Sequence, residues 1–112
     1  MPQCSPASSI FERTAEDVVN EEQFAAIAKA LAHPARVRIV AILTELETRN
    51  GCLNSDLVTE LGLAQSTVSE HLRILKKAKL ITAEPQPPRM CYRINSEQLA
   101  RFSTLLAKIQ AP

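Results

Sequence analysis

The stretch AQSTVSEHLRILKKAK, residues 64–79, carries the strongest structural signal in the chain. Val68, Leu72 and Leu75 recur at i, i+4 and i+7, which predicts a helix with a single apolar stripe. Short hydrogen-bonding side chains stand near the start of this helix, and cations stand near its end. That order is typical of a helix whose first turns contact base edges in a DNA major groove while its later turns meet phosphates. The alternative is an ordinary solvated helix with a favourable positive C-terminus, so the context has to decide.

Charge is spread unevenly along the 112 residues, although the net charge is only +1. Residues 1–63 hold five cations and nine anions, and residues 64–79 hold four cations against Glu70. Residues 80–112 hold four cations against two anions. A positive second half is expected if one face of the protein meets a polyanion. The length and the 46% hydrophobic content predict one domain of ordinary size.

Several classes of protein are excluded by what the sequence lacks. It has no run near twenty apolar residues and no secretory signal, so we expect a cytoplasmic protein without a membrane span. Cys4, Cys52 and Cys91 are widely spaced, so we expect neither a disulfide framework nor a structural zinc site. His33 and His71 lack the partners and glycine-rich turns of catalytic constellations, so we do not expect an enzyme.

The N-terminal part is expected to be an arm followed by a helix. Residues 1–19 should form a flexible arm with a short helical turn around Ile10–Val19. Asn20 followed by Gln23 resembles a capping box, which predicts that the first long helix begins there. This helix should end just before Pro34, because proline disfavours helical geometry in the preceding residue.

The middle of the chain predicts a helix-turn-helix. Residues 34–48 should form a second helix, with proline in its first turn, and its widely distributed apolar residues make it the central core helix. Asn54 or Ser55 can cap a short third helix. Gly62 then supplies the tight exit that leads into the helix over residues 64–79.

After residue 80 the pattern changes to strands. Residues 80–84 and 90–94 predict a β-hairpin with the basic Arg89 beside its tip. Such a hairpin attached to a helix-turn-helix is a wing. The fold class is therefore mainly α with a small β-hairpin, a winged helix-turn-helix over residues 20–110. Three prolines are expected to form a stiff hairpin tip: Pro85, Pro87 and Pro88.

The last helix suggests a dimer. Asn95 or Ser96 can cap it, and its apolar stripe is long for a chain of this size. Two terminal helices with uncovered apolar faces predict a homodimer built from the first and last helices. A two-fold dimer would present two recognition helices to major grooves about 34 Å apart, which matches a palindromic operator in double-stranded DNA. The stripe consists of Leu99, Phe102, Leu105, Leu106 and Ile109.

Three motifs point to a family. Residues 30–39, ALAHPARVRI, are similar to the signature AL-x-(H/D)P-x-R-x-(R)-I. Residues 56–72 are similar to DL-x-x-x-LGLSQ-(S/P)-TVS-x-HL, and residues 75–80 with 92–94 to L-x-x-AGLV followed by (Y)YR(L). The chain thus resembles the ArsR/SmtB family of bacterial winged-helix repressors. The resemblance implies a homodimeric DNA-binding repressor that leaves its operator when a metal ion, metalloid or oxidant reaches a few cysteine, histidine or carboxylate ligands.

The sequence also departs from that family. Leu53 and Ser55 stand where members that sense arsenic through the third helix carry a Cys-x-Cys. The last helix has no His or Asp, so the zinc site of other members is missing. Ala64 replaces the usual serine, which removes an N-cap at a cost of ~1 kcal/mol. Proline replaces the usual glycine of the wing tip, so we expect a stiffer wing.

The candidate DNA contacts follow from side-chain chemistry. Gln65 can bond adenine in a bidentate way, and the Thr67 methyl group can meet a thymine methyl group, although Thr67 could instead set the helix start. Glu70 either reads cytosine or points aside, and His71 either contacts phosphate or packs beside the turn. Cations of the later turns should meet phosphates, with Arg89 as the wing contact. The full set is Gln65, Ser66, Thr67, Ser69, Glu70, His71, Arg73, Lys76, Lys77 and Arg89.

The resemblance also implies where an inducer binds. Some metalloid-sensing relatives pair a cysteine of the N-terminal arm with one near the loop that holds Cys52. We therefore expect a Cys4–Cys52 site, within or between subunits, for a trivalent arsenical or another soft metal(loid), with Cys91 as a candidate third ligand. The alternatives are small buried cysteines, a cysteine redox switch, a repressor without an inducer, and a winged helix used only for protein contacts.

Overall fold

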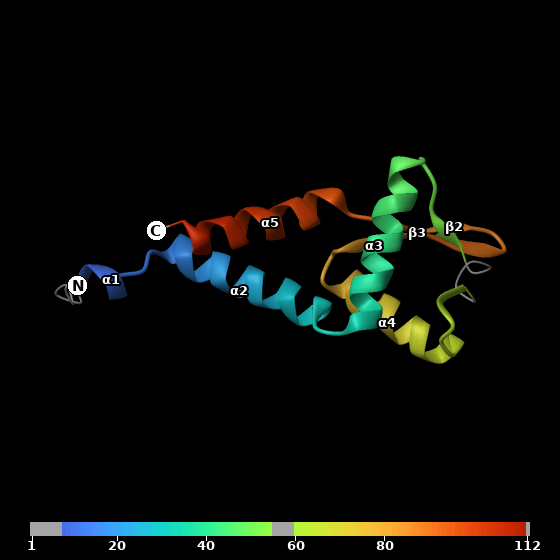
Figure 1. Ribbon diagram of the computed structural model, residues 1–112, viewed down its shortest axis with the longest axis horizontal. Helices are drawn as coiled ribbons and strands as arrows, with labels where there is room; N and C mark the ends of the chain where they lie inside the picture. The colour runs from blue at the N-terminus through green and yellow to red at the C-terminus, as the bar shows by residue number, and fades with distance from the viewer. Residues whose placement is uncertain (1–7, 55–59, 112) are drawn as a thin grey trace.

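The computed structural model describes residues 8–54 and 60–111. The molecule is elongated, with extents of 61 × 23 × 22 Å. A pair of helices projects from one end of a helical core, and a β-hairpin extends from the other (Figure 1). None of the described helices is long and apolar enough to span a bilayer. The elements are α1 Ser8–Phe11, α2 Ala15–Leu31, α3 Pro34–Thr48, β1 Leu53–Asn54, α4 Gln65–Lys77, β2 Ile81–Gln86, β3 Arg89–Ile94 and α5 Ser96–Gln110.

The first long helix, α2, begins earlier than its sequence pattern predicted. Its N-cap is Thr14, whose hydroxyl accepts a hydrogen bond from the Asp17 amide at 3.0 Å. The Asp17 carboxylate accepts one from the Thr14 amide at 2.9 Å, which lowers the pKa of Asp17. The capping box is therefore Thr14 with Asp17, and Asn20, the cap predicted from the sequence, lies inside the helix. The expected boundary between arm and domain at residue 19 therefore falls within α2.

The junction between α2 and α3 has the predicted form. Helix α2 ends at Leu31, and Pro34 occupies the first turn of α3. His33 is the N-cap of α3, and its Nδ1 accepts a hydrogen bond from the Ala35 amide at 3.0 Å. Ile39, on the inner side of α3, is fully buried, which confirms α3 as the central core helix.

The turn into α4 is described from residue 60 onward. The expected third helix lies largely in residues 55–59, outside the described residues. Glu60 and Leu61 form a 3₁₀ turn, and Gly62 follows with a left-handed backbone (φ 68°), as a tight exit requires. Leu61 itself is buried in the core.

The sheet has one strand more than the sequence predicted. Its order is β1-β3-β2, and the two-residue strand β1 pairs antiparallel with β3 through Leu53↔Tyr92 and Asn54↔Cys91. A strand of two residues is too short to show the alternation on which strand prediction depends. The hairpin over β2 and β3 is confirmed.

The hairpin tip is tighter than expected. The sequence predicts Pro85 in the tip, but Pro85 lies in β2 opposite Met90. Strand β2 is at the edge of the sheet, where proline is tolerated because one side of the strand needs no ladder hydrogen bonds. The turn itself is made by Pro87 and Pro88, which are joined by a cis peptide bond.

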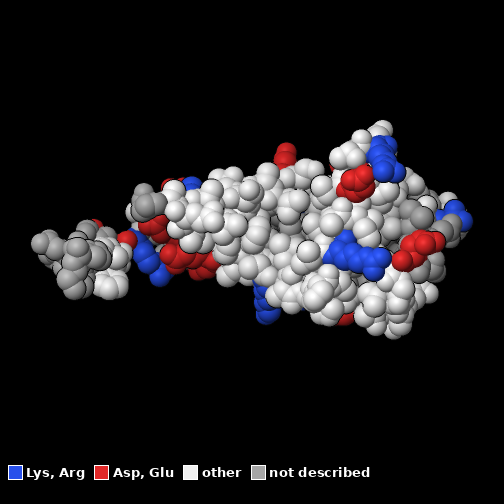
Figure 2. Space-filling view, viewed as in Figure 1, with Lys and Arg blue, Asp and Glu red and all other residues white. Residues whose placement is uncertain are grey.

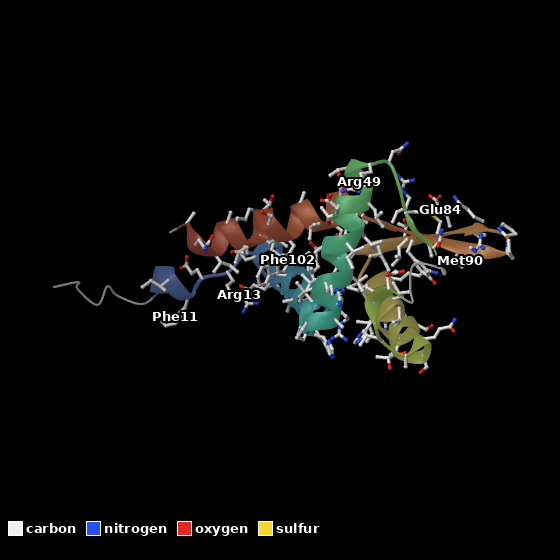
Figure 3. All side chains as sticks on the ribbon, turned by 45° about the vertical axis from the view of Figure 1, so that its right-hand side comes forward. Phe11, Arg13, Arg49, Glu84, Met90 and Phe102 are labelled. Atoms are coloured by element: carbon white, nitrogen blue, oxygen red, sulfur yellow. A yellow bond between two sulfur atoms is a disulfide. The ribbon has the colours of Figure 1, made fainter. Side chains whose placement is uncertain are left out.

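The core sits where α3, α4 and the sheet meet. The apolar stripe of α4 is buried as predicted, with Val68 and Leu75 at 0% exposure. On the side of the projecting pair, the rings of Phe24 on α2 and Phe102 on α5 stack with centroids 4.7 Å apart. Towards the free end of this pair, where Figure 3 labels Phe11, several large apolar side chains are exposed.

The missing cap of α4 can be tested by restoring it. Ala64 is the N-cap residue, and no side chain caps the helix. Ala64→Ser should raise the free energy of unfolding by about 0.5–1 kcal/mol, because a hydroxyl at this position can accept a first-turn N–H. Urea denaturation measures the change. Ala100→Ser adds the same hydroxyl at an exposed position within α5 and should give no gain; an equal gain in both variants would refute the capping argument.

Candidate nucleic-acid interface

Helix α4 presents a continuous polar face to solvent. Its inner face is buried, whereas the candidate contacts other than His71 are exposed. Because no side chain caps the helix at Ala64, the first-turn N–H groups can bind an external acceptor such as a phosphate. The exposed set is Gln65, Ser66, Thr67, Ser69, Glu70, Arg73, Lys76 and Lys77. We call this set the reading face.

An ion pair lies in the middle of the reading face. Arg73 donates from Nε to Glu70 Oε2 at 3.0 Å and from a terminal nitrogen to Oε1 at 2.6 Å. These hydrogen bonds lower the pKa of Glu70, so its carboxylate stays charged at neutral pH. Of the two alternatives for Glu70, the ion pair favours the second, in which the side chain turns aside, and a contact with cytosine stays a prediction. The same contact partly neutralises a cation that was expected to meet phosphate.

His71 belongs to the packing of α4 and not to the reading face. It is 6% exposed, and its ring lies 4.5 Å from that of His33. A terminal nitrogen of Arg36 lies 3.2 Å from His71 Nδ1, and Arg36 Nε donates to the Ala30 carbonyl at 2.6 Å. Of the two roles expected for His71, this geometry favours packing beside the turn, and a DNA contact by this residue stays a prediction.

The protonation state of His71 follows from this geometry. A guanidinium group has donors only, so His71 Nδ1 must accept and the ring proton must sit on Nε2. Burial lowers the pKa of His71, and its electrostatic interactions with His33 and Arg36 lower it further. Arg36 thus links the end of α2, the start of α3 and α4. This arginine belongs to the motif of residues 30–39, but the motif alone does not predict its contact with His71.

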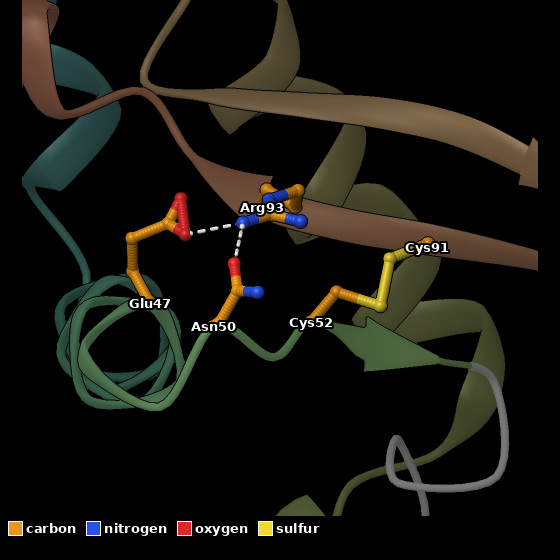
Figure 4. The surroundings of a disulfide bond; sticks show 5 residues. All are labelled: Glu47, Asn50, Cys52, Cys91 and Arg93. Carbon is orange, nitrogen blue, oxygen red and sulfur yellow. Dashed lines mark hydrogen bonds and ion pairs between the residues drawn. A yellow bond between two sulfur atoms is a disulfide. The ribbon is translucent and has the colours of Figure 1, made fainter.

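The wing is fixed to α3 through Arg93. This arginine donates to Glu47 Oε2 at 2.6 Å and to Asn50 Oδ1 at 3.5 Å, so β3 is joined to the C-terminal end of α3 (Figure 4). The pair raises the pKa of Arg93. Arg89, the expected wing contact, is exposed at the start of β3, next to the hairpin turn.

The cysteines are arranged differently from the prediction. Cys52 and Cys91 form a single disulfide with Cα atoms 5.7 Å apart (Figure 4), a pairing that the sequence did not predict. The two cysteines are separated by 39 positions in the sequence, and the register Asn54↔Cys91 brings them together. Cys91 is 1% exposed, whereas Cys52 is half-buried.

The predicted metalloid site falls only in part on the described residues. Cys4 lies outside the described residues, so the Cys4–Cys52 pair stays a prediction. While Cys52 and Cys91 are bonded to each other, neither sulfur can act as a thiolate ligand. Among residues 8–54 and 60–111, no group of three or more His, Cys, Asp or Glu side chains could hold a metal ion.

Comparisons with known proteins fit this arrangement. The family model described as "Bacterial regulatory protein, arsR family" matches residues 33–83, from the cap of α3 into β2. An uncharacterized HTH-type transcriptional regulator of Mycobacterium tuberculosis is 34% identical over 83 residues, which cover 74% of this chain and 70% of that protein. The HTH-type transcriptional regulator YgaV of Escherichia coli K12 is 30% identical over 91 residues, 81% of this chain and 89% of YgaV.

This chain belongs to the ArsR family of bacterial regulatory proteins. A homodimeric winged helix-turn-helix DNA-binding domain from Mycobacterium bovis has the same fold, with a TM-score of 0.66 at 24% identity over 88% of this chain and 89% of that one. The winged-helix fold expected from the sequence is thus confirmed. ArsR-family proteins are transcription regulators, which also confirms that the chain is not an enzyme.

The Glu70–Arg73 pair predicts how this ArsR-family protein responds to a charge change. Glu70→Gln should tighten DNA binding several-fold and steepen its salt dependence by up to about 0.9 per protomer, because Arg73 is released to meet a phosphate. Fluorescence anisotropy on duplex DNA across a salt series measures both quantities.

The matched control is Glu45→Gln, which breaks the exposed Glu45–Arg49 pair (3.0 Å) on α3. Arg49 lies at the end of α3 away from α4 (Figure 3), so this variant should bind DNA like the wild type. Equal effects of the two substitutions would mean that net charge alone, and not the release of Arg73, determines the affinity.

The buried His71 predicts a pH dependence of stability. Its pKa is lower in the folded than in the unfolded chain, so the unfolded chain takes up the proton first as the pH falls. The contribution of neutral His71 to the free energy of unfolding should be fully present above pH 6.5, the ordinary pKa of histidine, and should decrease as the pH falls below it. Chemical denaturation between pH 8 and pH 5 measures this loss.

His71→Asn keeps an acceptor for Arg36 but does not titrate, so it should lose less stability on acidification than the wild type. His33→Asn keeps an N-cap acceptor and should retain most of the pH dependence. An acid-induced loss that is the same in His71→Asn and the wild type would show that His71 is not its source.

Proposed function

We propose that this chain is a homodimeric, sequence-specific transcriptional repressor whose operator binding is controlled by its cysteines. The observation that carries the proposal is the reading face of α4, which leaves polar and cationic side chains exposed on a helix whose opposite face is anchored in the core. Family membership supports the same function. The cytoplasm, where operator DNA lies, is the proposed location.

The projecting helix pair is the proposed dimer interface. Val19 on α2 and Leu106 and Ile109 on α5 are 40–67% exposed, and Ile10 and Phe11 of α1 are 67% and 75% exposed. The face in Figure 2 bears few charges over the middle of this pair. An isolated chain would leave these apolar groups in water, whereas a second copy would cover them. A two-fold dimer places two α4 helices about 34 Å apart on a palindromic operator.

The disulfide favours a redox signal. Disulfides in cytoplasmic proteins are usually transient and serve catalysis or redox sensing. We take the dithiol as the resting state and the Cys52–Cys91 disulfide as the signalled state. The more exposed Cys52 thiolate attacks one oxygen of hydrogen peroxide and becomes a sulfenic acid, while the O–O bond breaks and the other oxygen leaves as hydroxide. The Cys91 thiol then displaces water from that sulfur, which forms the S–S bond.

The disulfide is connected to both DNA-binding elements through the backbone. Cys52 lies at the start of the segment that leads to α4, and Cys91 lies in the central strand of the sheet that forms the wing. The bond therefore ties the approach to the recognition helix to the wing. We infer that this constraint changes the relative placement of α4 and the wing and releases the operator.

A trivalent arsenical or another soft metal(loid) is the second candidate inducer. Once reduced, Cys52 and Cys91 are two thiols whose Cα atoms lie 5.7 Å apart, close enough for both sulfurs to bind one ion. This pairing would replace the Cys4–Cys52 pair or join it as a three-thiol site. A repressor without an inducer and a winged helix used only for protein contacts are the remaining alternatives.

Anisotropy with a duplex from the region upstream of this chain's own gene, and with a scrambled duplex, tests the proposal. The reduced protein should prefer the upstream duplex, and its affinity should fall steeply with salt. Hydrogen peroxide should weaken that binding by about tenfold or more. Cys52→Ser and Cys91→Ser should each abolish the peroxide effect, because neither variant can form the disulfide, while Cys4→Ser should behave like the wild type.

Each other outcome identifies a rival. No DNA binding at low salt would favour the protein-contact module. A peroxide effect that depends on Cys4 but not on Cys91 would support Cys4 and Cys52 as the responsive pair. Release of the reduced protein by phenylarsine oxide without any response to peroxide would favour the metalloid over the redox signal. Binding that no thiol reagent changes would indicate a repressor without a cysteine-based inducer.

A further inference from the structure

A basic groove separates α2 from α4. It encloses about 400 Å³, and four of the side chains that line it are cationic: Lys29 on α2, Arg36 on α3, and Arg73 and Lys77 on α4. The other lining residues are alanines and one isoleucine, so none of the described residues that line the groove is acidic. Converging cations on small, uncharged walls form a site suited to an anion.

The groove continues the reading face of α4. Arg73 and Lys77 are four residues apart and therefore lie on the same side of the helix, opposite the buried stripe. They belong both to the reading face and to the wall of the groove. Alanines at positions 26 and 30 keep the opposite wall on α2 low. An extended polyanion that lies along α4 can thus contact Lys29 while it stays in contact with α4.

The four cations are held in different ways. Arg36 is fixed by the Ala30 carbonyl and His71, so it is a stationary positive charge beside the groove. Arg73 is shared with Glu70. Lys29 and Lys77 are exposed, and neither makes an ion pair or a side-chain hydrogen bond with any described residue. These two lysines are therefore available to an incoming anion.

We propose that this groove is a second DNA contact, which binds a backbone phosphate of the operator between Lys29 and Lys77. The inference rests on the proposed function and extends it to α2, which carries none of the contacts expected from the sequence. Helix α2 runs from the groove towards the free end of the helix pair (Figure 1). In the proposed dimer, each groove therefore lies on the inner side of its recognition helix and faces the centre of the operator, between the two half-sites.

The test is the salt dependence of DNA binding by Lys29→Gln in the full chain. Removing one phosphate contact from each protomer should reduce the slope of log K against log[salt] by about 0.9 per protomer, or about 1.8 for the dimer. The reduction should be the same on the upstream and the scrambled duplex, because phosphate contacts carry no sequence information. Lys29→Glu should weaken binding further, and Lys77→Gln should resemble Lys29→Gln.

Arg49→Gln is the matched control. It removes one exposed positive charge at the end of α3 away from α4 and should leave the slope unchanged. Lys29 is exposed on a helix and glutamine is a good helix former, so circular dichroism should show the variant folded. An unchanged slope for Lys29→Gln, with normal DNA binding by the wild type, would overturn the groove but leave the repressor intact. Equal losses in Lys29→Gln and Arg49→Gln would overturn it as well, whereas absent binding by the wild type would overturn the proposed function itself.

Discussion

The burial of one helix face positions everything that this protein presents to DNA. Val68, Leu72 and Leu75 fasten α4 to the core, and burying a leucine contributes roughly 2–5 kcal/mol by the cost of its removal. Domains of this size are stable by only about 5–15 kcal/mol, so the orientation of the reading face and the stability of the fold cannot be separated. Apolar packing alone is not directional, whereas the Arg36–His71 hydrogen bond is. This bond fixes the rotation of α4 about its axis relative to the ends of α2 and α3.

Much of this architecture could be predicted because its signals are local. Pro34, the stripe of α4 and the polar cap Asn95 each act within a few residues, and each appears in the structure where the sequence indicated. The prediction of Asn20 as the cap of α2 was wrong for a related reason, since the hydrogen bonds between Thr14 and Asp17 that fix the cap exist only in the folded helix.

The features that escaped prediction depend on contacts between distant parts of the chain. The strand β1 exists only because β3 offers it a partner, and the Cys52–Cys91 pair follows from that pairing. The position of His71 depends likewise on Arg36, 35 residues earlier in the chain. Residue type alone made His71 a reasonable DNA contact, and only the packing of α4 against α3 turns it inward.

The Glu70–Arg73 pair has a consequence for how the regulator behaves in a genome. A cell offers on the order of 10⁶–10⁹ competing sites, and attraction to the backbone holds a cationic protein on all of them. An arginine already engaged by a carboxylate of its own helix adds little to that indiscriminate attraction. We infer that the acidic residue in the centre of the reading face shortens the residence of the protein on irrelevant DNA, and so leaves more of a small protein pool free to find its operator.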